Sequence, residues 1–529
     1  MRSRRVLALY AALLLAFAVV LCRLFYLAEN TAYAARAEAQ SSVMLSLPAR
    51  RGNFYDCDGL PLTGLTEQWQ ALCIPGQGNY TRLYAETDAA GQALLYRNRN
   101  RTAPFLLEVD RDLTAFGTRC YPSQKRYAET PLCPHLLGTL DSAGHGASGL
   151  EKALDDLLDG TGAQDTLVCT VTAQGTLRGE PQWNHVDNEA VDVKLTLSRS
   201  VQRAVEAVAA EMMTSGCILV LDTATAEIRA SASVPVFDPN DLASSLNEED
   251  SPFLNRALER YAVGSVFKPV LAAAALEETC LPVYECTGAV VVDGQIFRCA
   301  GGIAHGEVDL AAALEKSCNG YFVRLGQALG AERVRQMAEA FGFGKAIRLA
   351  GSLSAAAGIL PELQALHSSG QFANFCFGQG SLLASPLQVA AMMNTIACGG
   401  VYTTPSLLQG VLDETTGELQ ETLARPEPRQ VLSAQSAETL RRMLVQVVQQ
   451  GTAQDAADLE AGAGGKTGTA QTGQFTAEGT ERKNLWFAGF YPAQQPRYTV
   501  VVLQDGQTAP LCSSAAIFAQ VCTALQLLE

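Results

Sequence analysis

The sequence predicts a mixed α/β (α+β) protein in which an antiparallel sheet lies between helices, preceded by a strand-rich domain and one membrane-spanning helix. Three observations lead to this prediction: an apolar run at residues 6–28, a polar, turn-rich stretch over 40–191, and, from residue 193, a helix, a strand pair, a helical block, late strands and a closing helix. Of the 529 residues, 48% are apolar and 18% are charged, which is typical of folded globular protein.

Charge and motif spacing argue against several classes of function. The chain has 39 basic and 54 acidic residues, a net charge of -15, and no local basic stripe, so no nucleic-acid partner is expected. The five histidines show no HExxH or paired-ligand spacing, and the 15 cysteines include no CxxC pair. We therefore expect no cofactor, no zinc or other metal site and no thioredoxin-like centre. The histidines lie at positions 135, 145, 185, 305 and 367.

The amino terminus predicts a membrane anchor. Residues 6–28 are apolar except for Arg23, and at about 1.5 Å per residue they can cross about 30 Å of hydrocarbon. Arginines precede this run, which favours a cytoplasmic tail at residues 1–5, an anchor at 6–28 and an extracytoplasmic body after it. The alternative is a signal peptide that is cleaved at Ala32-Tyr33-Ala34, and it leaves the body on the same side of the membrane.

The cysteines allow two interpretations. All but one of the 15 follow the anchor, so in an oxidising compartment some would form disulfides, and Cys286 with Cys299 is the first pair to test. In reducing surroundings most would be small, buried, apolar side chains, which is the interpretation we favour. Connectivity cannot be deduced from the sequence, so both remain open.

The pattern of polar, apolar and turn-forming residues divides the body into two domains. Residues 40–191 predict a strand-rich spacer, with strands at 68–74 and 166–171 and one evident helix at 149–158. Residues 192–529 predict the sheet-and-helix domain, because a helix, a strand hairpin, a helical block, late strands and a closing helix follow one another there. Its expected helices are 200–213, 270–278, 310–329, 386–396 and 513–528, and its expected strands include 218–222, 227–231, 484–490 and 497–504.

The first chemical motif is Ser265-Val266-Phe267-Lys268. Residues three apart lie on one face of a helix, so the amine of Lys268 can approach the hydroxyl of Ser265. A serine hydroxyl needs an adjacent base to become a nucleophile, and a lysine serves as that base once burial or a nearby cation lowers its pKa. The spacing alone is weak evidence, since it also occurs on solvated helices.

Two further motifs follow in the same domain. Ser317-Cys318-Asn319 places a hydroxyl two residues before a carboxamide, a pair that can relay a proton and hold a substrate amide. Ser245-Leu246-Asn247 repeats this pattern in an acidic polar loop, and we assign that copy no role. The segment Lys466-Thr467-Gly468-Thr469 follows a glycine-rich stretch, and it predicts a strand that pairs with an extended peptide while its lysine attracts a carboxylate.

The three motifs in this order occur together in penicillin-binding proteins and class A β-lactamases. Further segments resemble those of class B penicillin-binding proteins, the membrane-anchored peptidoglycan D,D-transpeptidases of bacteria. These segments are RGNFYDCDG at 51–59, the stretch 135–162 with GLEKALDDLLDGTG, NRA at 255–257 running into Gly264, GQG at 378–380 with SPLQ at 385–388, and WFAGF at 486–490. The sequence departs from the family pattern at Ser198, Val263 and Ser385, none of which removes a reacting group.

The resemblance implies a fold and a set of roles. It implies a pedestal domain over 40–191 and a transpeptidase/β-lactamase-like domain with a five-stranded antiparallel sheet over 192–529. Ser265 would be the nucleophile, Lys268 its base, Ser317 a proton relay and Asn319 a holder of the substrate amide. Lys466, Thr467, Gly468 and Thr469 would bind the substrate carboxylate, and the backbone N–H groups of Ser265 and Thr469 would form the oxyanion hole.

The expected partners and the alternatives also come from the resemblance. We expect peptidoglycan stem peptides as substrates, β-lactam antibiotics as acylating inhibitors and a polytopic membrane glycan polymerase of the SEDS type as a protein partner. With water as acceptor, the same chemistry would give a D,D-carboxypeptidase or a β-lactamase. A different class of function is a non-catalytic scaffold that activates the polymerase, or a β-lactam sensor.

Overall fold

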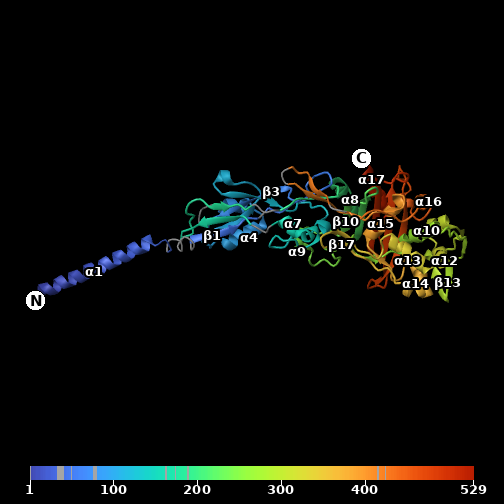
Figure 1. The fold of residues 1–529 in the computed structure, drawn as a ribbon, viewed down its shortest axis with the longest axis horizontal. Coiled ribbons are helices and arrows are strands. Elements are labelled where there is room, and N and C mark those ends of the chain that lie inside the picture. The colour runs from blue at the N-terminus through green and yellow to red at the C-terminus, as the bar shows by residue number, and fades with distance from the viewer. Residues whose placement is uncertain are drawn as a thin grey trace. The chain divides into compact units, whose positions relative to one another are not determined.

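The computed structural model describes residues 2–32, 41–48, 50–75, 80–160, 164–172, 174–186, 190–413, 416–422 and 425–528 (Figure 1). Part of the predicted cleavage site (33 and 34), the predicted start of the spacer domain (40) and the end of the family-like stretch (161 and 162) lie outside these residues. The chain divides into two compact units. The first contains residues 1–51, 64–126 and 159–190, and the second contains 52–63, 127–158 and 191–529.

The chain begins with a long apolar helix, α1 (Arg2–Glu29). The stretch Ser3–Glu29 has a mean hydropathy of 2.4 over its most apolar window, which is long and apolar enough to cross a membrane. Its large side chains are exposed, as expected of a helix whose apolar surface contacts lipid. The predicted single apolar helix at 6–28 is therefore present.

The first unit contains two small antiparallel sheets. One has the order β1–β6–β7 and the other β4–β3–β5. The predicted strands at 68–74 and 166–171 correspond to β3 and β6. The bounds are β1 (Ser42–Ser46), β6 (Thr166–Thr170), β7 (Gln182–Asn184), β3 (Thr66–Cys73), β4 (Phe105–Val109) and β5 (Cys120–Lys125).

The segment 40–191 holds more helix than the one predicted. The sequence pattern misses α3 (Tyr80–Ala85) and α4 (Ala89–Asn98), because both are short and α4 buries only three of its residues. The Asp88 carboxylate caps α4 by accepting the N–H of Gly91 at 2.8 Å. The predicted helix 149–158 is instead two short helices, α6 (Gly149–Ala153) and α7 (Asp155–Asp159), which belong to the second unit up to residue 158. The division at residues 40–191 and 192–529 stays a prediction.

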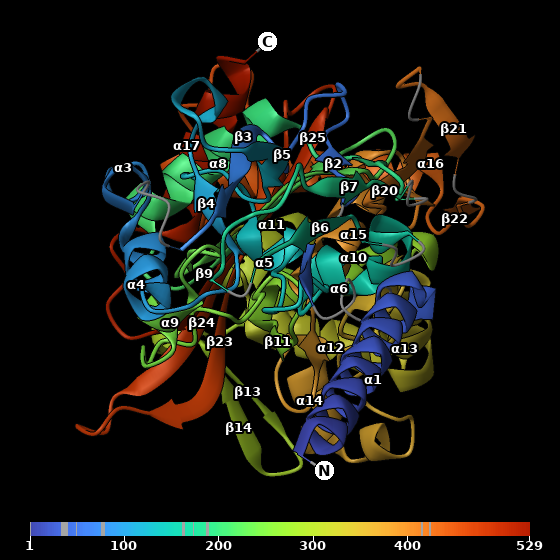
Figure 2. The same cartoon turned by 90° about the vertical axis from the view of Figure 1, so that its left-hand side faces the viewer.

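The second unit is built on the predicted five-stranded antiparallel sheet. Its strand order is β10–β9–β25–β24–β23, so the two strands of the early hairpin lie at one end and the late strands complete the sheet. The neighbouring long strands β23 and β24 can be followed in Figure 2. The strand β23, which carries the third motif, lies at the edge. The bounds are β9 (Gly216–Asp222), β10 (Ile228–Val234), β23 (Gly464–Phe475), β24 (Glu481–Tyr491) and β25 (Tyr498–Gln507).

Helices cover the sheet as predicted. The helices α8 (Arg199–Met212) and α17 (Ser514–Gln526) pack on each other and on the sheet. The helix α15 (Pro386–Ala397) packs on β9, β24 and β25, and all of its residues are buried. The helix α10 (Lys268–Glu277) contacts α12 (Asn319–Leu329), α13 (Ala331–Ala340) and α16 (Ala434–Gln449), so a helical block surrounds the helix that follows Ser265.

Several short elements of the second unit complete the surroundings of the site. The hairpin β13–β14 lies in the chain between the two strands of the short pair β12–β15. The helix α11 contacts α12 and α16, and α14 contacts α12. The bounds are β12 (Tyr284–Cys286), β13 (Ala289–Val292), β14 (Gln295–Arg298), β15 (Gly306–Val308), α11 (Leu310–Glu315) and α14 (Ser369–Cys376).

Candidate active site

Ser265 lies in a tight 3-10 turn, η2 (Gly264–Phe267), that runs directly into α10. Gly264 makes this entry possible because its φ of +63° is a left-handed conformation, and a Cβ there would lie 2.5 Å from the carbonyl oxygen of Thr469. The N–H of Gly264 donates to the carbonyl of Gly378 at 2.8 Å. The nucleophile candidate is thus held against the edge strand β23 at the start of a buried helix.

Lys268 is completely buried and has three acceptors. Its Nζ donates to the Ser317 carbonyl at 2.7 Å, to the Ser317 Oγ at 3.0 Å and to the Asn319 Oδ1 at 2.7 Å. Burial lowers the pKa of Lys268 to about 7, because removing the ammonium from water disfavours the charged form. An amine with this pKa is partly neutral near neutral pH and can accept a proton.

Ser317 and Asn319 reach this lysine because the predicted helix 310–329 is interrupted. It consists of α11 and α12, which are separated by a turn in which Ser317 has a left-handed φ of 54°. The Cys318 sulfur caps α12 by accepting the N–H of Tyr321 at 3.4 Å. The Asn319 Nδ2 donates to the carbonyl of Arg298 at 2.9 Å, which fixes its carboxamide with Oδ1 toward Lys268.

The third motif occupies the edge strand β23. Lys466 is completely buried, and its Nζ donates to the Thr467 carbonyl at 3.1 Å. The pKa of Lys466 lies well below its ordinary value, first because of burial and second because of the charge of Lys268. The Thr467 hydroxyl is hydrogen-bonded to the Thr452 hydroxyl at 2.7 Å.

All three motifs meet at one groove of about 1130 Å³. Ser265, Ser317, Asn319, Thr467, Gly468 and Thr469 line it. Lys268 and Lys466 lie buried behind this lining. The structure therefore brings together all eight residues singled out in the sequence. The duplicate pattern at Ser245 and Asn247 is absent from this lining.

The groove also contains residues that sequence reasoning gave no role. The Thr452 hydroxyl is hydrogen-bonded to the Thr467 hydroxyl, and the Gln379 Nε2 donates to the Thr469 carbonyl at 3.3 Å. Gln379 belongs to the family-like GQG segment, which was the available signal, whereas Thr452 and Asn374 lie in no recognisable pattern. Trp486, which belongs to the family-like WFAGF segment, is buried, yet it also lines the groove. Its Nε1 donates to the Ala262 carbonyl at 2.9 Å.

Comparison with known proteins agrees with this geometry. The family model "Penicillin binding protein transpeptidase domain" matches residues 216–523. The chain belongs to this family. It is 30% identical over 477 residues to the peptidoglycan D,D-transpeptidase PbpA of Mycolicibacterium smegmatis, covering 84% of this chain and 88% of that protein. It is 31% identical over 401 residues to the stage V sporulation protein D of Bacillus subtilis, covering 72% of this chain and 60% of that protein.

Solved structures of penicillin-binding proteins show the same fold. Penicillin-binding protein 3 of Mycobacterium tuberculosis, complexed with aztreonam, is 26% identical with a TM-score of 0.66, over 92% of this chain and 97% of that one. The D,D-transpeptidase domain of a peptidoglycan glycosyltransferase from Eggerthella lenta is 25% identical with a TM-score of 0.66, over 91% of this chain and 99% of that one. The resemblance to class B penicillin-binding proteins is confirmed, and with it the transpeptidase-like fold.

Proposed function

We propose that this protein is a peptidoglycan D,D-transpeptidase that cross-links stem peptides through an acyl-enzyme on Ser265. The observation that carries the proposal is the set of three hydrogen bonds from the buried Lys268 to Ser317 and Asn319, beside the turn that bears Ser265. Family membership and the names of the relatives support the same activity.

In the acylation step, Lys268 accepts the proton of Ser265 as its Oγ attacks the carbonyl carbon of the penultimate D-alanine. The new C–O bond forms a tetrahedral intermediate, whose oxyanion the N–H groups of Ser265 and Thr469 stabilise. The C–N bond to the terminal D-alanine then breaks, and that proton passes through Ser317 to the departing amine. The lowered pKa of Lys268 suits it to accept and return a proton near neutral pH.

Substrate binding is assigned to the remaining groove residues. Thr467 and Thr469 hydrogen-bond the terminal carboxylate, Lys466 adds positive charge behind them, and Gly468 lets the peptide backbone approach. Asn319 holds the amide side of the stem peptide. In the second step, an amine of a neighbouring stem peptide attacks the acyl-enzyme carbonyl, releases Ser265 and closes the cross-link. A β-lactam enters the first step as an acylating agent and blocks the second.

Covalent labelling by a fluorescent penicillin tests the enzyme assignment. The wild-type protein is expected to be labelled, and Ser265→Ala to be unlabelled because it lacks the attacking oxygen. Ser244→Ala, which removes an exposed hydroxyl from the short helix α9 (Leu242–Ser245), is the matched control and should be labelled normally. An unlabelled wild type would contradict the proposal and favour a scaffold that does not react.

We also propose that α1 anchors the protein with residues 1–5 in the cytoplasm and the catalytic unit outside. The three arginines before the apolar run support this orientation. Residues 40–191 resemble a pedestal, and we propose that a separate polytopic glycan polymerase supplies the strands to be cross-linked. Co-purification of the full-length membrane form tests this partner, and repeated isolation without any polymerase would argue against it.

A further inference from the structure

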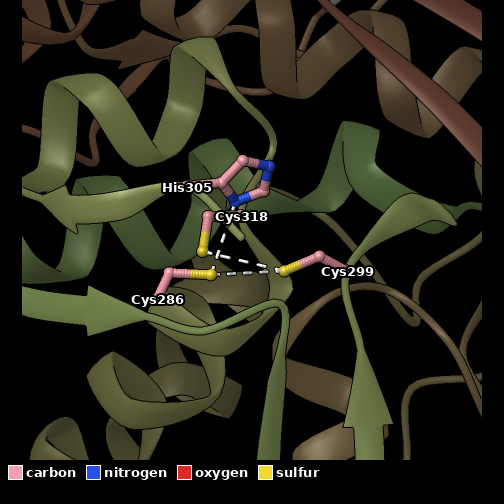
Figure 3. Close-up of side chains that lie close together, drawn as sticks. All are labelled: Cys286, Cys299, His305 and Cys318. Carbon is pink, nitrogen blue, oxygen red and sulfur yellow. Dashed lines mark hydrogen bonds between the residues drawn. The ribbon is translucent and has the colours of Figure 1, made fainter. Parts of the chain in front are cut away.

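Three cysteines and one histidine form a compact cluster next to the groove (Figure 3). Cys286 ends β12, Cys299 follows β14, His305 immediately precedes β15, and Cys318 lies in the turn before α12. Their potential ligand atoms all lie within 4.8 Å of one another. The three cysteines are at most 3% exposed. The motif search missed this cluster because its members come from four segments and lack the close paired spacing of common zinc motifs.

Three distances between ligand atoms of the cluster match those of a tetrahedral site. The Cys286 and Cys299 sulfurs are 3.7 Å apart, those of Cys299 and Cys318 are 3.9 Å apart, and the His305 Nδ1 is 3.5 Å from the Cys286 sulfur. Around a tetrahedral zinc ion, Zn–S bonds of about 2.3 Å and a Zn–N bond of about 2.05 Å place sulfurs about 3.8 Å apart and sulfur and nitrogen about 3.6 Å apart.

The geometry of the cluster fits a disulfide less well than a metal site. A sulfur–sulfur bond is about 2.05 Å long, and Cys286 and Cys299 are both free thiols in the structure. Such a bond would also leave the third cysteine and the imidazole without a function in the cluster. Figure 3 shows all four side chains directed toward a common centre, which a two-residue cross-link does not require.

The cluster lies at the amino-terminal end of α12. The Cys318 sulfur accepts the N–H of Tyr321 at 3.4 Å, and the Cys299 sulfur lies 3.9 Å from the Cys318 sulfur. The amino-terminal end of a helix attracts negative charge, such as that of thiolate ligands. Buried thiolates without a counter-ion are costly, and a bound cation removes that cost.

We propose that Cys286, Cys299, Cys318 and the Nδ1 of His305 form a structural zinc site of the Cys₃His type that positions the second catalytic motif. Four protein ligands complete the tetrahedron and leave no position for water, as in structural sites. Cys318 lies between Ser317 and Asn319, and Cys299 follows Arg298, whose carbonyl accepts the Asn319 amide. The metal therefore ties the turn that carries both residues to the end of the β13–β14 hairpin.

Metal analysis of the full-length, detergent-solubilised protein tests the site. One zinc ion per chain is expected by inductively coupled plasma mass spectrometry after dialysis against metal-free buffer. Cys286→Ser and Cys299→Ser should lose the ion, because each removes a thiolate ligand. Cys522→Ser is the matched control, since Cys522 is also fully buried but lies in α17, and it should retain the ion.

Cobalt substitution of the wild type provides a readout that needs no variant to fold. Tetrahedral Co(II) bound by three sulfurs should give intense visible d–d bands and thiolate charge-transfer absorption, and zinc should abolish both. Wild-type protein that holds no zinc and gives no such spectrum overturns the proposal, as does a Cys286–Cys299 disulfide found by mass spectrometry of the freshly purified chain. These readouts do not depend on acylation, so their failure would leave the proposed transpeptidase activity intact.

The positioning role of the zinc ion predicts a second result, which is tested separately from the metal content. Removal of zinc by a chelator should slow penicillin acylation of the wild type, and added zinc should restore it. An acylation rate unchanged by complete loss of the ion would refute the positioning part of the proposal, while the metal content would still decide whether the site exists.

Discussion

The pH dependence of Ser265 acylation tests the chemical role of Lys268 most directly. Only the neutral amine accepts a proton, and burial lowers the pKa of this lysine to about 7 from its ordinary 10.5. About half of the molecules then carry a neutral Lys268 at pH 7, compared with about one in three thousand at an unshifted pKa. The acylation rate should therefore rise about tenfold per pH unit below pH 6 and level off above pH 8.

The assay measures the second-order rate constant for labelling by a fluorescent penicillin from pH 5 to 9.5 at constant ionic strength. The reagent must be stable over this range, and the fluorescence of a pre-labelled sample controls for effects of pH on the dye. A rate that keeps rising tenfold per unit through pH 9 would show an unshifted base. A rate independent of pH would remove Lys268 from the rate-limiting proton transfer, and either result would refute the reasoning.

Three further outcomes follow from the same contacts. Asn319→Ala should slow penicillin labelling by at least about tenfold, because it removes a hydrogen-bond acceptor of the buried Lys268. Asn247→Ala, in the duplicate motif, should leave the labelling rate unchanged. Equal labelling rates in the two variants would contradict the role assigned to Asn319. Gly264→Ala should lower both the melting temperature and the rate of penicillin labelling, because its new Cβ would lie 2.5 Å from a backbone oxygen. The control is Gly294→Ala, which has a similar φ and nothing within 4 Å, so it should cost only about 1 kcal/mol of backbone strain. Equal losses of stability in the two variants would refute the steric explanation. Between pH 7 and 9 the unfolded chain binds a proton at Lys268 that the folded chain has released, so this residue makes the free energy of unfolding rise with pH. Chemical denaturation should therefore show a smaller slope of unfolding free energy against pH in Lys268→Met than in the wild type.

Much of the site could be predicted because its chemistry is encoded in short segments. Ser265 and Lys268 lie one helical turn apart, so local geometry alone predicts that they share a face. The relation between Lys268 and Asn319 could not be derived in this way, since it depends on tertiary packing of separate helices. The family resemblance supplied that relation, and the hydrogen bond of 2.7 Å now gives it a physical basis.

The errors in the fold have local causes. The prediction of one helix over 310–329 followed the apolar residues at 310–314 and 321–329 and passed over the polar run at 315–320, where the chain turns at Ser317. The short α4 buries only Gly91, Leu95 and Asn98, so it lacks the regular buried apolar face from which a helix is predicted. The Cys₃His cluster could not be predicted from sequence spacing, because tertiary pairing of β12 with β15 places Cys286 opposite Gly306, next to His305.

The three bonds of Lys268 have a mechanical consequence for the groove. They join the start of α10 to the turn before α12, so these two walls cannot separate without leaving a buried amine and its acceptors unsatisfied. The wall formed by the edge strand β23 has no comparable charged tie to either of them among the described contacts. We therefore expect that strand to yield before the other two walls when a bulky peptide or antibiotic enters, and substitutions that stiffen β23 should restrict the size of ligand that enters.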